Sequence, residues 1–414
     1  MAETRLGVRL AERRVGHIDR NRFGLLSWVP DADWLADDQH PRLGLDFLRQ
    51  PGVQQSTHAL PVWFENLLPE RDSALRAALC RQWSLPDHDD LGLLATLGGD
   101  LPGAVRVVAA PHAPLPIPAT LSADPHDDRW RFSLAGMQLK LSMGQQGHRF
   151  AVSTSDGEEA WIVKLPGRDL PDLPQVEHAT MAWARAAGFP VPAHEVVSID
   201  RLDGVPAEWA EHTPFAFAVR RFDRRRDGTR VHHEDLCQAL TIRPAHKYGN
   251  TGGRRVGLHG ALRLVADACG EADARSFTQR IGFVVASGNG DAHLKNWSLE
   301  WGSADRPRLS PLYDQVCTVR WPAFGWSPSK GKGPEMGLGL AAVRHFAQVD
   351  TALLDDVAAR SGQPWAAEEV AAGIQRAVEG WDAVGELAPE AMRAALAEHW
   401  ARVPLLRRFG WKAG

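Results

Sequence analysis

The chain has 414 residues, of which 24% are charged and 44% hydrophobic, with a formal net charge of -4. A chain of this length is expected to form two or three domains around a substantial buried core. Because its charges nearly balance, the composition argues against a basic protein that coats nucleic acid and against a polybasic membrane anchor. The four cysteines have no short paired spacing, so neither a zinc cluster nor a disulfide framework is predicted.

The first residues lead into an alternating strand pattern, and not into a basic region followed by an apolar run. No uninterrupted apolar stretch is long enough to span a bilayer. We therefore expect a soluble protein that resides in a reducing cytoplasm and has no membrane partner.

Residues 1–110 are expected to form a β-rich N-terminal subdomain. Short β-favouring runs at 6–10, 15–19 and 23–28 predict an antiparallel meander. Helical patterns at 75–83 and 91–97 and a strand at 103–109 follow. Trp63 and Phe64 are predicted to be core or interface aromatics. A domain boundary is indicated by a group of prolines, namely Pro111, Pro114, Pro116 and Pro118.

Residues 111–222 are expected to form a second, smaller lobe that holds phosphate. Small residues at 133–140 precede strands at 148–154 and 160–165, and such residues let backbone amides approach a phosphate closely. This candidate phosphate loop lacks the glycine spacing of a Walker loop or a conventional kinase loop, so an ordinary hairpin turn is the alternative. The candidate ATP-binding residues here are Ala135, Gly136, Met137, Gln138, Leu139 and Lys140.

Lys164 lies in an apolar strand, where an unpaired ammonium group would be costly to bury. In a kinase, such a lysine binds the α- and β-phosphates and pairs with an acid of the following helix. A helix is predicted at 175–187, and Glu177 or Glu158 is the candidate acid. The alternative is a lysine that extends from a sheet edge into water. The strand at 214–222 ends in the candidate adenine-binding hinge, which consists of Arg220, Arg221 and Phe222.

Residues 223–414 are expected to form a helical C-terminal lobe. The predicted helices lie at 234–240, 258–268, 272–286, 340–347, 352–361, 366–380 and 389–402. His232 and His233 are adjacent and would point to different helix faces, so they do not form a zinc motif. The basic clusters 224–226 and 254–255 are interpreted as solvated faces, with DNA phosphate contacts as the alternative.

The most informative stretch is Gly290-Asp291-Ala292-His293-Leu294-Lys295-Asn296. An acid followed five residues later by an amide has the spacing of a kinase catalytic loop. There the Asp receives the proton of the attacking hydroxyl and the Asn holds magnesium. Asp314, at the end of an extended run at 309–314, is the candidate second magnesium ligand. The alternative is an ordinary corner between a helix and a loop, because Gly, Asn and Asp favour turns.

Several motifs in one order give the chain a resemblance to the HipA family of bacterial toxin serine/threonine kinases, and the resemblance spans nearly the whole sequence. The resemblance implies an α+β, two-lobed, protein-kinase-like fold with a β-rich N-terminal part and a helical C-terminal lobe. The matching segments are 63–70, 133–140, 162–166, 221–224, 290–296 and 311–314.

By this resemblance Asp291 is the catalytic base and Asn296 and Asp314 hold Mg²⁺. Lys164 binds the phosphates of ATP, and Ser133 matches the serine that such kinases autophosphorylate, which silences the enzyme. Further ATP contacts are implied at the hinge and at His293, Leu294 and Lys295. The family phosphorylates aminoacyl-tRNA synthetases, stalls translation and is neutralised by a HipB-like helix-turn-helix antitoxin that binds operator DNA.

The chain departs from the family pattern in three places. Arg220 stands where an acid is usual, and Met137 and Leu139 replace an Ala and a Glu of the phosphate loop. The backbone contacts expected at the hinge do not depend on the side chain at position 220.

Two other functions are open at this point. A small-molecule kinase of the aminoglycoside or choline type also has Gly-Asp followed by an Asn, but it does not require the β-rich extension before Pro111. A non-catalytic co-repressor that acts with an antitoxin would not need the phosphoryl-transfer groups, yet none of their charges is missing.

Overall fold

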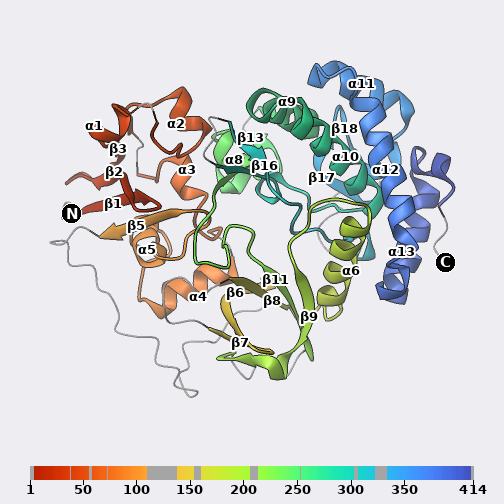
Figure 1. Cartoon of the computed structure of the whole chain (residues 1–414), viewed down its shortest axis with the longest axis horizontal. Coiled ribbons are helices and arrows are strands. Elements are labelled where there is room, and N and C mark those ends of the chain that lie inside the picture. The colour runs from red at the N-terminus through yellow and green to blue at the C-terminus, as the bar shows by residue number, and fades with distance from the viewer. Residues whose placement is uncertain are drawn as a thin grey trace. The chain divides into compact units, whose positions relative to one another are not determined.

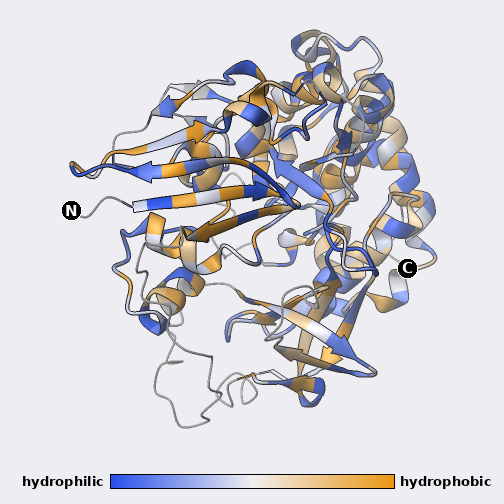
Figure 2. Cartoon of the chain, turned by 60° about the vertical axis from the view of Figure 1, so that its left-hand side comes forward, coloured by the Kyte–Doolittle hydropathy of each residue, from blue (hydrophilic) through white to orange (hydrophobic). Residues whose placement is uncertain are grey.

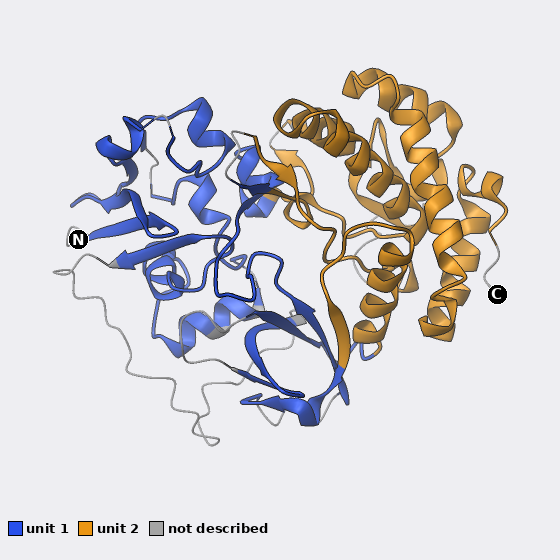
Figure 3. Ribbon diagram, in the orientation of Figure 1, with its two compact units in different colours: residues 1–171, 197–245, 300–305 blue, residues 172–196, 246–299, 306–414 orange. Residues whose placement is uncertain are grey.

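The fold is described from a computed structural model, in which residues 4–37, 39–55, 58–71, 73–109, 138–152, 160–205, 213–251, 253–302, 306–321 and 333–411 are described. The chain divides into two compact units that alternate along the sequence (Figure 3). Unit 1 contains residues 1–171, 197–245 and 300–305, and unit 2 contains 172–196, 246–299 and 306–414. Of the three predicted segments, 1–110 belongs to unit 1, whereas 111–222 and 223–414 each contribute to both units.

Unit 1 begins with a five-stranded sheet of order β4-β3-β2-β1-β5 (Figure 1). β1 pairs antiparallel with β2, and β2 pairs antiparallel with β3, so the predicted meander is confirmed. Along β1, Leu6, Val8 and Leu10 are buried and alternate with more exposed residues, which is the period of two that a one-sided sheet requires. Figure 2 shows hydrophobic and hydrophilic residues interspersed along the strands. The strands are β1 (Thr4–Leu10), β2 (Arg13–Arg20), β3 (Leu26–Pro30), β4 (Gln54–Gln55) and β5 (Val105–Ala109).

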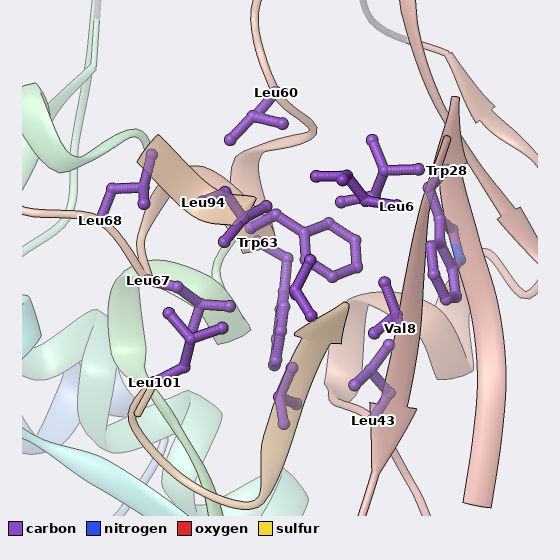
Figure 4. Packing of buried hydrophobic residues seen from close by; sticks show 14 of the residues in the cluster. Leu6, Val8, Trp28, Leu43, Leu60, Trp63, Leu67, Leu68, Leu94 and Leu101 are labelled. Carbon is purple, nitrogen blue, oxygen red and sulfur yellow. The ribbon is translucent and has the colours of Figure 1, made fainter. Parts of the chain in front are cut away.

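Short helices cover this sheet and complete its hydrophobic core (Figure 4). Trp28, Trp63 and Phe64 are at most 1% exposed, and the Trp63 and Phe64 ring centroids lie 5.2 Å apart. Trp63 and Phe64 are therefore core aromatics, as predicted. The helices are α1 (Ala32–Leu35), α2 (Leu45–Arg49), α3 (Val62–Glu65), α4 (Ala74–Gln82) and α5 (Asp90–Leu97).

A second sheet has six strands in the order β10-β7-β6-β8-β11-β9. Leu139, Val163 and Ala218, on adjacent strands, lie in one buried cluster. Residues 138–140, predicted as part of a loop, belong to β6. The strands are β6 (Gln138–Gln146), β7 (Arg149–Val152), β8 (Trp161–Pro166), β9 (His194–Ser198), β10 (Leu202–Asp203) and β11 (Phe215–Arg220), and β12 (His232–Asp235) with α8 (Leu236–Ala239) also lies in unit 1.

Unit 2 is largely helical. Glycines bring α10 and α12 close together, because a Cβ on Gly373 would lie 1.9 Å from the Gln279 carbonyl oxygen. The Trp183 indole of α6 donates to the Ala377 carbonyl of α12 at 2.7 Å. The helices are α6 (Leu173–Ala186), α9 (Leu258–Cys269), α10 (Glu271–Ser287), α11 (Thr351–Ser361), α12 (Ala366–Trp381) and α13 (Glu390–Arg402). Among the described residues, no helix has both the length and the apolar character needed to cross a membrane.

The helix predicted at 340–347 is wrong. The chain forms two antiparallel strands there, β17 (Glu335–Leu340) and β18 (Val343–His345), joined through Ala341 at φ 49°. Met336, Leu338 and Leu340 are all buried, and their alternation favours a strand over the local helical propensity. The other strands of unit 2 are β13 (Asn250–Thr251), β14 (Arg254–Arg255) and β16 (Arg308–Leu309), and β15 (Ser298–Trp301) continues the chain into unit 1.

A buried ion-pair network holds the N-terminal subdomain against the segment after β11, within unit 1. Asp223 accepts from Arg221 Nε at 3.0 Å, from an Arg224 guanidinium nitrogen at 2.9 Å and from the Gly103 backbone N–H at 2.8 Å. Both arginines also donate to Asp100. Arg224 is 5% exposed, so its assignment to an exposed basic cluster is wrong, whereas Arg225 and Arg226 are exposed.

Burial alone would raise the pKa of Asp223, but the charge of Arg221 and hydrogen bonds from His233 and Arg221 hold that pKa well below its usual range. The carboxylate is therefore ionised and paired at neutral pH.

We predict that Asp223→Ala lowers the free energy of unfolding by about 3–5 kcal/mol, because it leaves two buried guanidinium groups without their shared carboxylate. Urea denaturation measures the change. The control is Asp203→Ala, which removes an exposed partner of Arg149 and should leave the unfolding midpoint nearly unchanged. Equal effects of the two substitutions would contradict the structural role given to Asp223.

Glu234 is a second buried acid of unit 1. Its carboxylate accepts from the Leu45 backbone N–H at 2.9 Å and from the Trp63 and Trp301 indoles at 3.1 Å each. Burial raises the pKa of Glu234 to about 7, with a contribution from nearby Asp235, although the three hydrogen bonds favour the ionised form.

This shift predicts a pH-dependent stability. An unfolded glutamic acid titrates at about 4.3, so between that pH and about 7 the folded protein binds more protons than the unfolded chain. The contribution of Glu234 to the free energy of unfolding is therefore present below the pKa of the unfolded chain. It is lost as the pH rises through the pKa of the folded protein. The free energy of unfolding of the wild type should fall relative to that of Glu234→Gln from pH 5 to pH 8, as urea titrations at several pH values would show. A difference between the two proteins that is constant with pH would contradict the shift.

Candidate active site

The candidate catalytic loop, residues 288–296, begins where α10 ends in unit 2. Gly288 terminates the helix at φ 62°, and a Cβ there would lie 2.6 Å from the Val319 side chain. The Thr318 hydroxyl donates to the Gly288 carbonyl at 3.0 Å and accepts from the Gly290 backbone N–H at 2.6 Å. A single side chain therefore fixes both ends of the turn that precedes Asp291.

Asp291 and Asn296 are connected directly. The Asn296 side-chain amide donates to the Asp291 carbonyl at 2.9 Å, and the Asp291 backbone N–H donates to Asn289 Oδ1 at 3.0 Å. Because the nitrogen of the Asn296 amide is the donor here, its oxygen is the atom that could coordinate a cation. The Asp291 side chain is 28% exposed, so a substrate hydroxyl could reach it.

The carboxylate of Asp291 also has a partner that the sequence did not indicate. Tyr248 Oη donates to Asp291 Oδ1 at 2.7 Å. The Tyr248 ring lies edge-on to His293, whose Nε2 is 4.0 Å from the same Oδ1. His293 and Leu294 are buried, and Lys295 is half-buried.

The residues on both sides of Asp314 are hydrogen-bonded to the catalytic loop. Tyr313 Oη donates to the Lys295 carbonyl at 2.9 Å, and Gln315 Oε1 accepts from the Asn289 amide at 3.0 Å. Asp314 lies between them with φ 55°, in the left-handed region that few non-glycine residues adopt. Strained backbone of this kind is concentrated at functional sites. The structure thus brings Asp291, Asn296 and the Asp314 backbone into one hydrogen-bonded assembly.

β17 lies against the catalytic loop. A Cβ added to Gly337 would be 2.9 Å from the Gly290 carbonyl oxygen and 3.0 Å from the Ala292 backbone. The strand can therefore approach the loop this closely only because residue 337 is a glycine. The glycine-rich sequence before residue 340 therefore contributes to the positioning of the loop.

Lys164 lies in β8 of unit 1 and is 4% exposed. It is directly opposite Lys140 on β6 and Phe217 on β11, so the three side chains share one face of the sheet. This face is opposite to the one that carries the buried Leu139 and Val163, and Lys164 Nζ is 5.6 Å from the Phe217 ring centroid. Two lysines on one face give that face positive charge, which suits an anion.

Part of the predicted phosphate site cannot be placed. Ser133, Ala135, Gly136 and Met137 lie outside the described residues, as does Glu158. Glu177 is fully buried in α6 and belongs to unit 2, whereas Lys164 belongs to unit 1, so their pairing stays a prediction.

At the hinge, Arg220 is the last residue of β11 and pairs with Trp161. The Arg221 backbone N–H donates to the Ala160 carbonyl at 2.7 Å, and its side chain belongs to the ion-pair network around Asp223. The Phe222 ring packs against His233 with centroids 4.8 Å apart. The observed role of the Arg221 side chain is thus structural, and adenine binding at residues 220–222 stays a prediction for the backbone.

Sequence reasoning missed Tyr248, Gln315, Thr318 and Gly337, which position the loop from outside the motif. One signal was available for the first of these: the chain has only 2 tyrosines, Tyr248 and Tyr313, and both contact the catalytic loop.

The donor set fits magnesium. Carboxylate and amide oxygens are the ligands that Mg²⁺ accepts, and phosphoryl-transfer sites use one or two carboxylates together with substrate phosphates. Among the residues that the structure describes, no group of three or more His, Cys, Asp and Glu side chains could hold a metal ion. Asn296 and Asp314 offer one amide and one carboxylate, a donor set that suits an ion whose other ligands come from substrate phosphates.

Comparisons with known proteins agree with this geometry. Residues 132–381 match the model of the HipA-like C-terminal domain and residues 6–108 match that of the HipA N-terminal domain. Protein Y4dM of Sinorhizobium fredii, named as a candidate kinase, is 34% identical over 328 residues, which cover 76% of this chain and 78% of that protein.

The serine/threonine-protein kinase toxin HipA of Shewanella oneidensis is 26% identical over 300 residues, covering 65% of each chain. The fold also matches a chain in the solved complex of S. oneidensis HipA, HipB and operator DNA. This match has a TM-score of 0.74 and 21% identity, and it covers 98% of this chain and 99% of that one. The chain therefore belongs to the HipA family and has its kinase-like α+β fold.

Proposed function

We propose that this chain is a toxin serine/threonine protein kinase that transfers the γ-phosphate of ATP to a serine of a translation component. An aminoacyl-tRNA synthetase is the expected substrate, and growth inhibition is the expected outcome. The observation that carries the proposal is the hydrogen-bonded assembly of Asp291, Asn296 and the segment around Asp314, in a chain of the HipA family. The S. oneidensis relative is named as a serine/threonine-protein kinase toxin, which supports the proposal.

Asp291 is the proposed base. It takes the proton of the serine hydroxyl while the serine oxygen attacks the γ-phosphorus of ATP and the bond from that phosphorus to ADP breaks. Asn296 and Asp314 would hold Mg²⁺, which supplies positive charge against the phosphate oxygens. Most of the catalysis in such a reaction comes from positioning and electrostatic stabilisation, and that is what the bonded loop offers.

Lys164 and Lys140 are the proposed phosphate-binding cations. Their common face of the sheet supports this role, because two ammonium groups on one face attract an anionic phosphate. We propose further ATP contacts at residues 135–139, at the hinge backbone of residues 220–222 and at residues 293–295.

A HipB-like helix-turn-helix antitoxin is the proposed partner, and operator DNA would be bound through it. The solved S. oneidensis complex of HipA with HipB and operator DNA supports this proposal. The N-terminal domain match at 6–108 favours the toxin over a small-molecule kinase, and the presence of the phosphoryl-transfer groups favours a kinase over a non-catalytic co-repressor.

Asp291→Asn should reduce phosphate transfer from labelled ATP by about 10²- to 10⁴-fold, because an amide cannot accept the hydroxyl proton. Purified protein would be assayed on itself and on a panel of aminoacyl-tRNA synthetases, and growth would be followed after induction. The control is Asp356→Asn, at an exposed position of α11, which should keep wild-type activity. Undiminished labelling by Asp291→Asn would exclude Asp291 as the base.

Ser133 is the proposed site of inhibitory autophosphorylation, since a dianion beside the phosphate loop would compete with the nucleotide. Intact-mass spectrometry after incubation with ATP should show one phosphate fewer in Ser133→Ala than in the wild type. Ser27→Ala, in β3 of the N-terminal sheet, is the matched control and should keep the wild-type phosphate count. The same count in Ser133→Ala as in the wild type would assign the modification to another residue.

A further inference from the structure

Tyr248 has no role in the chemistry proposed above, yet it contacts the proposed base directly. The hydroxyl donates to Asp291 Oδ1 at 2.7 Å across 43 residues of sequence. The second tyrosine of the chain, Tyr313, contacts the Lys295 carbonyl near the end of the loop and Ser298 Oγ just after it. The two tyrosines therefore contact the same loop at chemically different points.

The fold holds Tyr248 in place from both sides. The Lys247 carbonyl accepts from the Leu294 backbone N–H at 3.0 Å, which attaches this segment to the catalytic loop independently of the phenol. On the other side, Gly249 has φ 78° and starts the turn into the hairpin of β13 and β14, and a Cβ there would lie 2.0 Å from the Val256 carbonyl oxygen. The phenol is thus presented to Asp291 by backbone that has little freedom to move.

The contact fixes one oxygen of the carboxylate. Oδ1 accepts from Tyr248 and has His293 Nε2 on the same side at 4.0 Å. We infer that Tyr248 is a positioning residue that anchors Oδ1 and so sets the orientation in which the Asp291 carboxylate receives the proton of the substrate hydroxyl. This inference rests on the proposed kinase function.

Two physical effects follow from the anchored oxygen. A hydrogen bond donated to a charged carboxylate is stronger than one between neutral groups, so the phenol holds Oδ1 firmly. The same bond restricts rotation of the side chain, so the carboxylate is already oriented when the substrate hydroxyl arrives. Neither effect involves ATP, so loss of the phenol hydroxyl should change turnover and leave nucleotide binding unchanged.

The test is Tyr248→Phe, which removes the hydroxyl and keeps the ring that packs against His293. In phosphate transfer from ATP, kcat should fall by about 10- to 100-fold, the size expected for one hydrogen bond to a charged group. The affinity for a fluorescent ATP analogue should be unchanged, so the loss should appear in kcat and not in nucleotide binding. Tyr313→Phe is the matched variant, and it should lower the melting temperature.

A second measurement does not depend on turnover. With 2 tyrosines, protein labelled with 3-fluorotyrosine should give two ¹⁹F resonances, and Tyr248→Phe identifies the one from Tyr248. That resonance should have a different chemical shift in Asp291→Ala, because the substitution removes the acceptor of the phenol hydrogen bond.

The outcomes separate the two claims. Absence of phosphate transfer by the wild-type protein overturns the proposed function and the positioning role with it. If the wild type transfers phosphate, wild-type kinetics in Tyr248→Phe overturn the positioning role alone, and so does a Tyr248 resonance whose chemical shift is the same in Asp291→Ala.

Discussion

The catalytic loop depends on a small set of hydrogen bonds to residues 313–318, because between α10 and β15 it has little regular secondary structure of its own. Thr318 bonds the backbone on both sides of Asn289, Gln315 holds the Asn289 amide, and Tyr313 bonds the far end of the loop. A loop without a helical or strand ladder must satisfy its backbone polar groups through such partners. Here the partners flank Asp314, so the same bonds also locate the second acid.

Glycines in unit 2 and buried acids in unit 1 both hold neighbouring segments of the chain close together. In unit 2, Gly288, Gly337 and Gly373 allow approaches that any Cβ would prevent, and two of them border the catalytic loop. In unit 1, Asp223 and Glu234 join the N-terminal sheet and helices to the segment after β11 with several donors each. A buried acid that accepts several N–H groups favours one arrangement of the chain, because few other packings would supply all of its hydrogen-bond donors.

Much of the fold could be predicted from the sequence, since period-two alternation in β1 and apolar helical faces are local signals. The motif could also be predicted, because Asp291 and Asn296 lie within one short stretch. The local misreading at 340–347 aside, what failed depends on distant partners. Arg224 stands in a basic run that resembles a solvated face, yet it is buried against Asp100, 124 residues earlier. Tyr248 and Thr318 bond the loop across 43 and 28 residues, and no local pattern encodes such a contact.

The left-handed backbone at Asp314 restricts which amino acids evolution can place there. Only glycine, asparagine and aspartate adopt that conformation readily, and of these three only aspartate is anionic. A relative that has abandoned catalysis could keep the same turn with glycine or asparagine and fold equally well. Under the proposed role of Asp314 as a magnesium ligand, the residue type at this one position would then separate inactive descendants from working enzymes within a set of otherwise similar sequences.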